Sequence, residues 1–437
     1  MNRFERLIYN LVRSNPRLKN TIRNAYQAAW DLLPSKKVET RYEIVAREGF
    51  FFGFHDHTPF SHDDSKLLAN RFTIPLRMPE LGETLEVGYF DGPNHNEYHA
   101  VAETCAWLWH MGCKLQWRGK RDQIVFNDHK DGRNIARVVD VHTGTDHVLP
   151  DSIGSVSPDG EWAVGYSFAR VARCMPGYGY HYDIGDPELN VTAPQRNGLH
   201  SIHLDSGEQR LLFSLQDLAG MNPEKSMQDA LHFVSHTVFS PDSQRFIFLH
   251  RWIDPNGDIN KRWSRLISSD LEGNRVNIFP TVEMVSHIGW RGPGHVIAYC
   301  RVPEHDDQYV LFDDAEPERY EIVGLGQFSS DGHPSFDPTG RWMVTDTYPD
   351  RRRVQTLVLY DILEMKRYDI ARLPMPKRFQ SPSAYKHWSC DLHPRWDGSG
   401  TRLCFDATHT GERSLCTLDL GRDFGAELTR SLPNTHY

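Results

Sequence analysis

The segment DGHPSFDPTGRWMVTDTYPD, residues 331–350, contains the pattern that decides the fold. Its centre, FDPTGRWMV, consists of two short apolar runs around a Pro/Gly turn, which is the pattern of a β-hairpin. The edges of the segment are unusual for a hairpin, because Asp331 and His333 precede the first strand and TDTYPD follows the second. We expect the hairpin to be scaffold and its polar edges to belong to a site.

The hairpin pattern recurs seven times after residue 50. The turns are SHDDS 61–65, RGKRD 118–122, SPDG 157–160, SPDS 240–243, RGPGH 291–295, DPTG 337–340 and DGSG 397–400. The units are spaced about 40 to 60 residues apart, with one longer gap that holds an insertion at 174–197. Repeats of this length with four short strands each are typical of a β-propeller, whose closed ring hides its sheet edges. The sequence therefore predicts an all-β, seven-bladed β-propeller over residues 38–437, with two stacked β domains as the alternative.

Composition agrees with an all-β chain and narrows the class of protein. The 437 residues include 11 Trp, 17 Tyr and 22 Phe, and the net charge is −9, which argues against nucleic-acid binding. The seven cysteines form no CxxC pair, so buried free thiols are expected rather than a disulfide framework or a zinc site. No apolar run reaches membrane-spanning length and no signal peptide is recognisable, so a cytoplasmic protein is expected.

The N-terminal residues 1–37 differ from the rest. They contain eight Lys or Arg and two Asp or Glu, a net charge of +6, which leaves −15 on the other residues. Apolar residues at helical spacing predict a basic amphipathic helical arm. Such an arm either lies peripherally on an anionic inner membrane face, or packs on its own domain or a second subunit.

Histidines occur in phase with the repeat. In five units a histidine lies three or four residues before the turn or before the tryptophan that precedes it: His57, His236, His287, His333 and His393. Cys113 and Ile153 take this position in the other two units. Because the first strand of each blade lines the central channel, equal positions in different blades have equal heights. We therefore expect these histidines to converge at one mouth of the channel.

The second strand of each blade runs back to the same mouth, so residues at its end should join the histidines. These residues are Arg170, Arg173, His250, Arg251, Asp346, Tyr348 and His409. Neutral imidazoles are common ligands of divalent metals, and arginines bind carboxylates bidentately. The pattern predicts a metal site formed by His236, His287, His333 and His393, or histidines that are merely hydrogen-bonded within their blades. Asp331 and Asp391 stand two residues before a histidine and could orient the imidazole or bind the metal directly.

Three stretches, SHIGW, DGHPSFDPTG and FSPDSQRFIFLHRW, resemble the oligogalacturonate lyase family, seven-bladed propellers with TolB-type repeats. The likeness covers roughly residues 230–350 and implies β-elimination of uronate oligosaccharides with bound Mn²⁺; Zn, Fe and Ca are alternatives. It implies metal binding by His287 and His333 and a catalytic role for His250. The sequence departs from the family pattern at Asp331, where a histidine is expected, and at Phe328, where a glutamine is expected.

Elimination requires removal of a proton α to a carboxylate, which needs a base and neutralisation of the carboxylate charge. The predicted roles are His250 as base, Arg251 or Arg170 as carboxylate clamp and Tyr348 as leaving-group acid. The residues predicted to bind the acidic oligo- or polysaccharide are His57, Arg173, Asp331, Asp346 and His409. Tyr178 and Tyr180 in the insertion should line the sugar cleft or pack a lid. A non-catalytic glycan-binding or membrane-associated scaffold is the alternative function, and the absence of a G-x-S-x-G motif disfavours a serine hydrolase.

Overall fold

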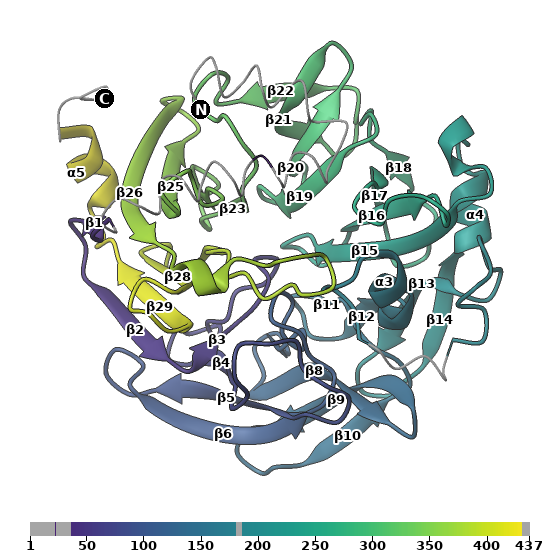
Figure 1. Ribbon diagram of the computed structural model, residues 1–437, viewed down its shortest axis with the longest axis horizontal. Coiled ribbons are helices and arrows are strands. Elements are labelled where there is room, and N and C mark those ends of the chain that lie inside the picture. The colour runs from purple at the N-terminus through teal and green to yellow at the C-terminus, as the bar shows by residue number, and fades with distance from the viewer. Residues whose placement is uncertain (1–21, 23–35, 181–185, 431–437) are drawn as a thin grey trace.

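The computed structural model describes residues 22, 36–180 and 186–430. Seven antiparallel sheets surround a central axis, and each contributes one blade to the ring in Figure 1. The predicted seven-bladed β-propeller is confirmed, and the alternative of two stacked β domains is wrong. The predicted N-terminal helical arm lies almost entirely outside the described residues, and the boundaries 1–37 and 38–437 remain a prediction.

The first four blades follow one another along the chain, each from its innermost to its outermost strand. They are β3 (Phe50–Phe51), β4 (Leu67–Arg71), β5 (Leu85–Asp91) and β6 (Glu97–Thr104); β7 (Gln116–Trp117), β8 (Gln123–Lys130), β9 (Arg133–Asp140) and β10 (Asp146–Leu149); β11 (Ser155–Val156), β12 (Trp162–Gly165), β13 (Gly198–His203) and β14 (Gln209–Ser214); and β15 (Leu231–Phe239), β16 (Phe246–Ile253), β17 (Trp263–Ser269) and β18 (Asn277–Ile278).

The remaining three blades close the ring. Their strands are β19 (Val285–Trp290), β20 (His295–Val302), β21 (His305–Asp313) and β22 (Tyr320–Val323); β23 (Ser335–Phe336), β24 (Trp342–Asp346), β25 (Val354–Asp361) and β26 (Lys366–Pro374); and β27 (Arg395–Trp396), β28 (Arg402–Ala407) and β29 (Ser414–Asp419). Strand β2 (Ile44–Glu48) pairs with β29 as the outermost strand of blade seven, and the chain then enters blade one. A strand from the start of the described chain therefore fastens the last blade. Strand β1 (Glu39–Thr40) adds a fifth strand to blade six.

Short helical segments connect some of the strands. They are α3 (Phe168–Cys174), α4 (Leu215–Gly220) and the 3₁₀ turns η1 (Lys225–Met227) and η2 (Lys377–Phe379), and a further helix, α5 (Phe424–Arg430), follows the last strand. Among the described residues, no helix combines the length and the apolarity needed to cross a bilayer.

The hairpin turns form for the reason that their sequences suggest. In blade six the carboxylate of Asp337 accepts hydrogen bonds from the backbone N–H of Trp342 at 2.7 Å and of Thr339 at 3.3 Å. Gly340 closes the turn at φ +69°, a conformation that glycine adopts without steric cost. Side chains of the turn thus satisfy backbone groups that the strands cannot pair.

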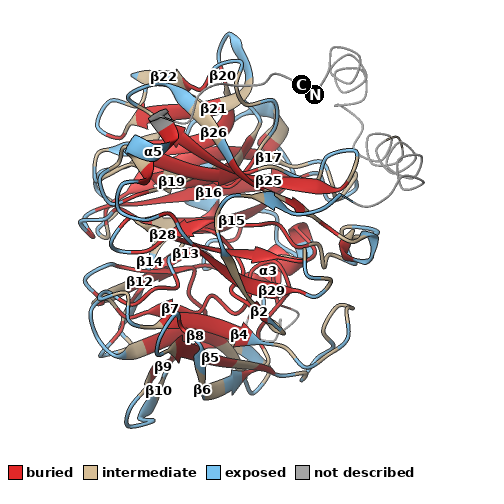
Figure 2. Ribbon diagram, turned by 90° about the vertical axis from the view of Figure 1, so that its left-hand side faces the viewer, coloured by how far each residue is buried: buried red, intermediate tan, exposed pale blue. Residues whose placement is uncertain are grey.

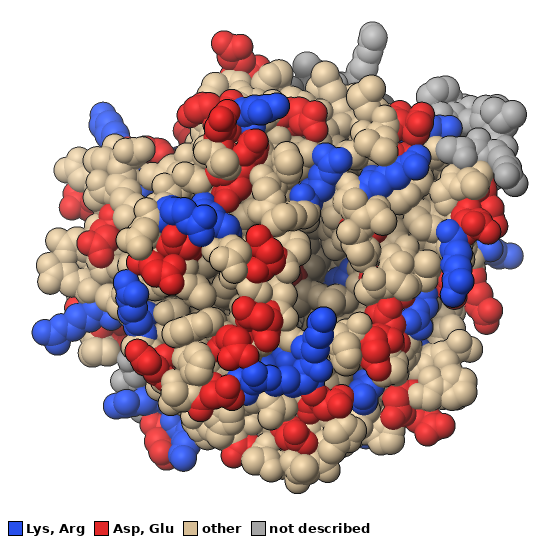
Figure 3. All heavy atoms as spheres, turned by 180° about the vertical axis from the view of Figure 1, so that it is seen from behind, with Lys and Arg blue, Asp and Glu red and all other residues tan. Residues whose placement is uncertain are grey.

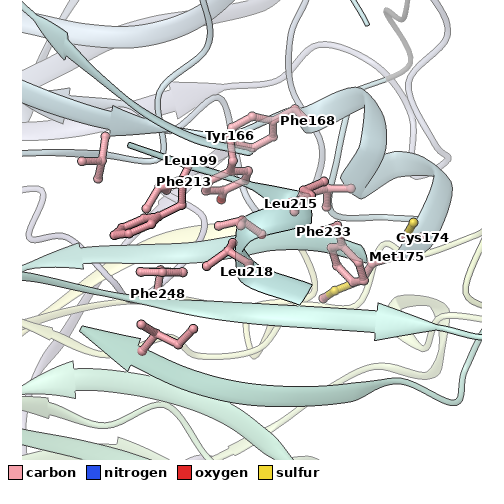
Figure 4. Close-up of a cluster of buried hydrophobic side chains, with 14 of the residues drawn as sticks. Tyr166, Phe168, Cys174, Met175, Leu199, Phe213, Leu215, Leu218, Phe233 and Phe248 are labelled. Atoms are coloured by element: carbon pink, nitrogen blue, oxygen red, sulfur yellow. The ribbon is translucent and has the colours of Figure 1, made fainter. Parts of the chain in front are cut away.

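The core lies between blades as well as within them. Figure 2 shows buried strands through the middle of the ring and exposed loops around it. Between blades three and four, Figure 4 shows Tyr166, Phe168, Phe213, Phe233 and Phe248 packed together, all of them buried. The seven cysteines are free thiols and all except Cys105 are buried, as expected.

Candidate metal centre in the propeller channel

The centre of the ring is filled by residues 52–57 of blade one. Phe54 is 3% exposed, and its ring lies within 4.6–6.1 Å of six imidazole rings, those of His55, His110, His236, His287, His333 and His393. The backbone N–H groups of Phe52 and Gly53 each donate to the carboxylate of Asp406 at 2.9 Å. This carboxylate holds the segment across the channel, so the histidines gather around an apolar plug.

Five imidazoles form a continuous row beside this plug, which we call the imidazole row. Ring centroids are 4.0 Å apart for His287 and His333, and 4.2 Å apart for His333 and His393. The row continues at 4.8 Å to His110 and at a further 4.9 Å to His387. Three of its members come from the inner edges of blades five, six and seven, as predicted, and two come from loops between blades.

Hydrogen bonds orient three of these rings in the same way. Nδ1 of His333 donates to Asp346 at 2.7 Å, Nδ1 of His287 donates to Asp331 at 3.0 Å, and Nδ1 of His393 donates to the carbonyl of Gly53 at 2.8 Å. In a neutral ring this leaves the lone pair on Nε2. The Nε2 atoms of His333 and His393 are buried and have no hydrogen-bond partner among the described residues. Such an arrangement is typical of metal-binding histidines, so the residues fit a divalent metal.

Asp346, the acid of the TDTYPD motif, connects blades six and seven. Its carboxylate accepts from N and Nδ1 of His333 at 2.8 and 2.7 Å, and from the N–H groups of Leu392 and His393 at 3.1 and 3.2 Å. Burial opposes both charges of the pair, yet their contact lowers the pKa of Asp346 and raises the pKa of His333. Asp346 therefore orients an imidazole instead of facing a substrate, for which it was predicted.

The other central histidines are held neutral. Burial lowers the pKa of His55, His110, His236 and His393 well below the usual value, and neighbouring positive groups add to the effect. A neutral imidazole keeps the lone pair that a metal needs. These buried, neutral rings therefore have the protonation state that a cation site requires.

Local backbone distortions turn the histidines toward the channel. His236 and His393 adopt left-handed φ values of +57° and +46°, which are uncommon for residues other than glycine. The strand register shifts between Ser235 and Val238, around His236, and between Val285 and Ile288, around His287. Such bulges redirect side chains and are frequent beside functional sites.

The predicted ligand set is brought together only in part. His287, His333 and His393 are successive members of the imidazole row, whereas His236 packs against Phe54 and Tyr178 at 4.8 and 6.2 Å. His55, which the sequence analysis missed, takes the place predicted for His57: its ring lies 5.5 Å from His287 and 5.2 Å from His333. His57 instead lies against the carbonyl of Gly154 at 3.2 Å.

His250, the predicted base, lies within blade four, outside the imidazole row. Nε of Arg265 donates to its Nδ1 at 3.1 Å, so its proton is on Nε2, which donates to Nδ1 of His232 at 3.0 Å. His232 in turn donates to the carbonyl of Met227 at 3.1 Å. The only lone pair of His250 is therefore occupied, and the geometry does not support its role as base.

Two of the predicted arginines, Arg170 and Arg173, and also His409, have their partners outside the imidazole row. Arg170 donates to the carbonyls of His232, Glu188 and Val191, so it fixes the insertion and is not a carboxylate clamp. Arg173 is exposed and contacts Asn190. His409 is half-buried and its charge partner is Glu48, away from the row.

Arg251 remains a candidate carboxylate clamp, and it lies near a second arginine, Arg262, that the sequence analysis missed. Burial and the charge of Arg262 lower the pKa of Arg251 to about 9, and its Nε is buried with no hydrogen-bond partner among the described residues. Arg262 also interacts electrostatically with Tyr178 and Tyr348. The two arginines thus bring positive charge to the same side of the cluster.

Two segments, 174–180 and 375–391, cover the cluster, and we call them the lid. Figure 1 shows the yellow-green segment crossing above the centre of the ring toward α3. The ring of Tyr178 lies 4.6 Å from His110 and 5.2 Å from His387, so it covers the row, while Tyr180 stacks on Phe168 at 4.5 Å and packs in the core. Tyr348 is 40% exposed and lies 5.8 Å from His333.

A cavity of about 140 Å³ lies farther along the inner strands of blades four to six, with His55 and Asp56 in its wall. Figure 3 shows that the face opposite to that of Figure 1 is hollowed near the centre of the ring. Residues 52–57 thus contact the imidazole row through Phe54 and line this cavity through His55 and Asp56.

Comparison with known proteins identifies the fold. No family model matches the sequence, and no curated protein matches it by sequence. A solved oligogalacturonate lyase in complex with manganese superposes with a TM-score of 0.60 and 14% identity, covering 90% of this chain and 100% of that chain. An oligogalacturonate lyase from Vibrio parahaemolyticus gives a TM-score of 0.57 and 13% identity over 90% of this chain and 100% of that chain. The resemblance predicted from the sequence is confirmed for the fold.

Proposed function

We propose that this chain is a metal-dependent lyase that cleaves a uronate-containing oligo- or polysaccharide by β-elimination. The observation that carries the proposal is the pair of buried Nε2 atoms on His333 and His393, unpartnered and held in place through Nδ1. The shared fold with a lyase solved in complex with manganese supports it.

His287 and His333 would hold the cation, with His55 and His393 beside them. Manganese is the first candidate, and zinc or iron would also accept imidazole ligands. When bound, a divalent cation supplies positive charge that acidifies the proton α to a uronate carboxylate.

Arg251 and Arg262 would bind that carboxylate. A guanidinium offers two parallel donors to a planar anion, and neither arginine has a carboxylate partner among the described residues. The carboxylate of the substrate would thus neutralise positive charge of these two neighbouring arginines.

His387 replaces His250 as the proposed base. Its Nδ1 is buried and has no hydrogen-bond partner among the described residues, and burial with Arg262 and Arg413 lowers its pKa to about 4. A uronate carboxylate bound to Arg262 would offset part of that effect and raise the basicity of the ring. Tyr348 could then donate a proton to the leaving oxygen.

Access to this site requires movement of the lid. His110, His333 and His393 are each at most 2% exposed, so the closed arrangement admits no sugar residue. Because His387 and Tyr178 belong to the lid, closure over a substrate would bring the base to it.

The test is turnover of defined oligosaccharides of galacturonate, glucuronate, mannuronate and guluronate by the Mn²⁺-loaded chain. We expect an unsaturated uronate product, detected by ultraviolet absorbance, and a loss of about 10²–10⁴-fold for His387→Ala. His333→Ala should abolish turnover and binding of the cation held by His287 and His333. His409→Ala, outside the row, is the control and should remain active.

Folded, metal-loaded protein that yields no unsaturated product from any of these substrates would refute the lyase. Saturable oligosaccharide binding without product would instead support the non-catalytic glycan-binding alternative.

A further inference from the structure

The imidazole row is longer than one coordination sphere. Metal–nitrogen bonds are about 2.1 Å long and a site commonly has about four ligands, so one ion binds only those rings that converge on it. Along the row, four consecutive centroid separations of 4.0–4.9 Å connect five rings. The first cation proposed above uses the end at His287 and His333, and His387 at the other end is the proposed base, which leaves His110 between them without a role.

The other end contains a compact group of metal-ligand atoms. His110, Asp391 and His393 each offer one atom, and these atoms all lie within 4.8 Å of one another. Two further groups among the described residues meet the same criterion, and they contain exposed side chains: Asp91, Glu97 and His99, and Glu161, His203 and Asp205. The group at His110 is the buried one.

Asp391 differs from the other two carboxylates of the site. Asp346 accepts four hydrogen bonds and Asp331 accepts two, so both serve to orient other groups. Asp391 is 6% exposed, and among the described residues no donor forms a hydrogen bond with its carboxylate. A largely buried carboxylate without a donor favours a cation beside it.

His110 has the complementary property. The ring is buried, and neither Nδ1 nor Nε2 has a hydrogen-bond partner among the described residues. Its Nδ1 lies 3.8 Å from Oδ2 of Asp391, too far for a hydrogen bond but suitable for two ligands of one ion. Buried polar atoms without a partner are rare, and a bound cation would give one of the two nitrogens a partner.

We propose that a second divalent transition-metal cation binds between His110, Asp391 and His393, next to the first. Two imidazoles and one carboxylate are a ligand set that accepts Mn²⁺, Co²⁺ or Zn²⁺. The inference rests on the proposed function only for the first cation. It makes the channel a two-cation centre, with one ion between blades five and six and the other at blade seven and the lid.

The test is metal stoichiometry. The full chain is stripped with chelator, dialysed against Mn²⁺ or Co²⁺, freed of loosely bound metal and analysed for metal per chain. We expect two equivalents in the wild type and one in Asp391→Asn and in His110→Ala. The Mn²⁺-loaded wild type should give the electron paramagnetic resonance signal of an exchange-coupled pair, and both variants that of isolated ions.

The control for surface binding is the double variant His99→Ala, His203→Ala, which disrupts both exposed groups and should keep two equivalents. One equivalent in the wild type, or two retained in both Asp391→Asn and His110→Ala, overturns the inference. If neither variant folds, an uncoupled Mn²⁺ signal from the fully loaded wild type overturns it.

Failure of this inference and of the proposed function are distinguishable. Two bound cations without unsaturated product would refute the proposed lyase and support the second metal site. One bound cation with unsaturated product would support the lyase and overturn the second metal site.

Discussion

Replacing Asp346 by asparagine keeps the shape of a buried carboxylate but changes one acceptor oxygen into an NH₂ donor. In the wild type, Oδ1 accepts two bonds from His333, and Oδ2 accepts the N–H groups of Leu392 and His393 at 3.1 and 3.2 Å. With the amide oxygen toward His333, two buried N–H groups lose their acceptor. Each costs about 1–3 kcal/mol, so the expected loss of unfolding free energy is about 2–6 kcal/mol.

The opposite amide orientation is no better for metal binding. Its NH₂ group would face Nδ1 of His333, which then has to accept a hydrogen bond and carry its proton on Nε2. That tautomer removes the lone pair proposed to bind the cation. Changes to groups that orient metal-binding histidines typically cost 10–100-fold in metal affinity, and we expect a loss of that size for Asp346→Asn.

Urea denaturation of the metal-free chain and Co²⁺ titration of the folded chain measure the two effects. Asp361→Asn is the control, because this buried carboxylate of the same blade also accepts two backbone N–H groups, those of Leu363 and Glu364, and its side-chain partner is Arg341 and no histidine. It should lower stability and leave Co²⁺ affinity unchanged. Wild-type Co²⁺ affinity in Asp346→Asn, or equal losses of affinity in both variants, would refute the orienting role.

Two further outcomes follow from buried histidines outside the row. Burial lowers the pKa of His57 and His232 to about 4, so below pH 6.5 the unfolded chain binds more protons than the folded one. At 1.36 kcal/mol per pH unit, these two rings should contribute about 4 kcal/mol to a loss of unfolding free energy between pH 7.5 and pH 5 in urea denaturation, and equal values at the two pH values would contradict the prediction. His250→Gln breaks the chain of hydrogen bonds from Arg265 to Met227 and should lower the thermal midpoint while turnover per folded molecule persists. An active-site effect without destabilisation would return the catalytic role to His250.

Periodic features of the chain were predictable from the sequence. The seven Pro/Gly turns at near-regular spacing imply blades, and blade geometry puts equivalent residues at equal heights in the channel. For that reason His287, His333 and His393 could be grouped without coordinates. Asp331 and Asp391 were expected beside His333 and His393, but Asp331 orients His287 of the preceding blade and Asp391 lies near His110.

Residues that break the periodicity could be found only in the folded structure. His110 and His387 lie in loops between blades, and His55 lies in the turn that follows β3, so no repeat position marks them. Arg170 and His250 occupy promising sequence positions, but the carbonyls and side chains around them satisfy their hydrogen bonds. A sequence determines which residues recur, because strand and turn propensities are local. Which lone pair stays free depends on contacts between residues far apart in the chain, and only the closed ring brings those residues together.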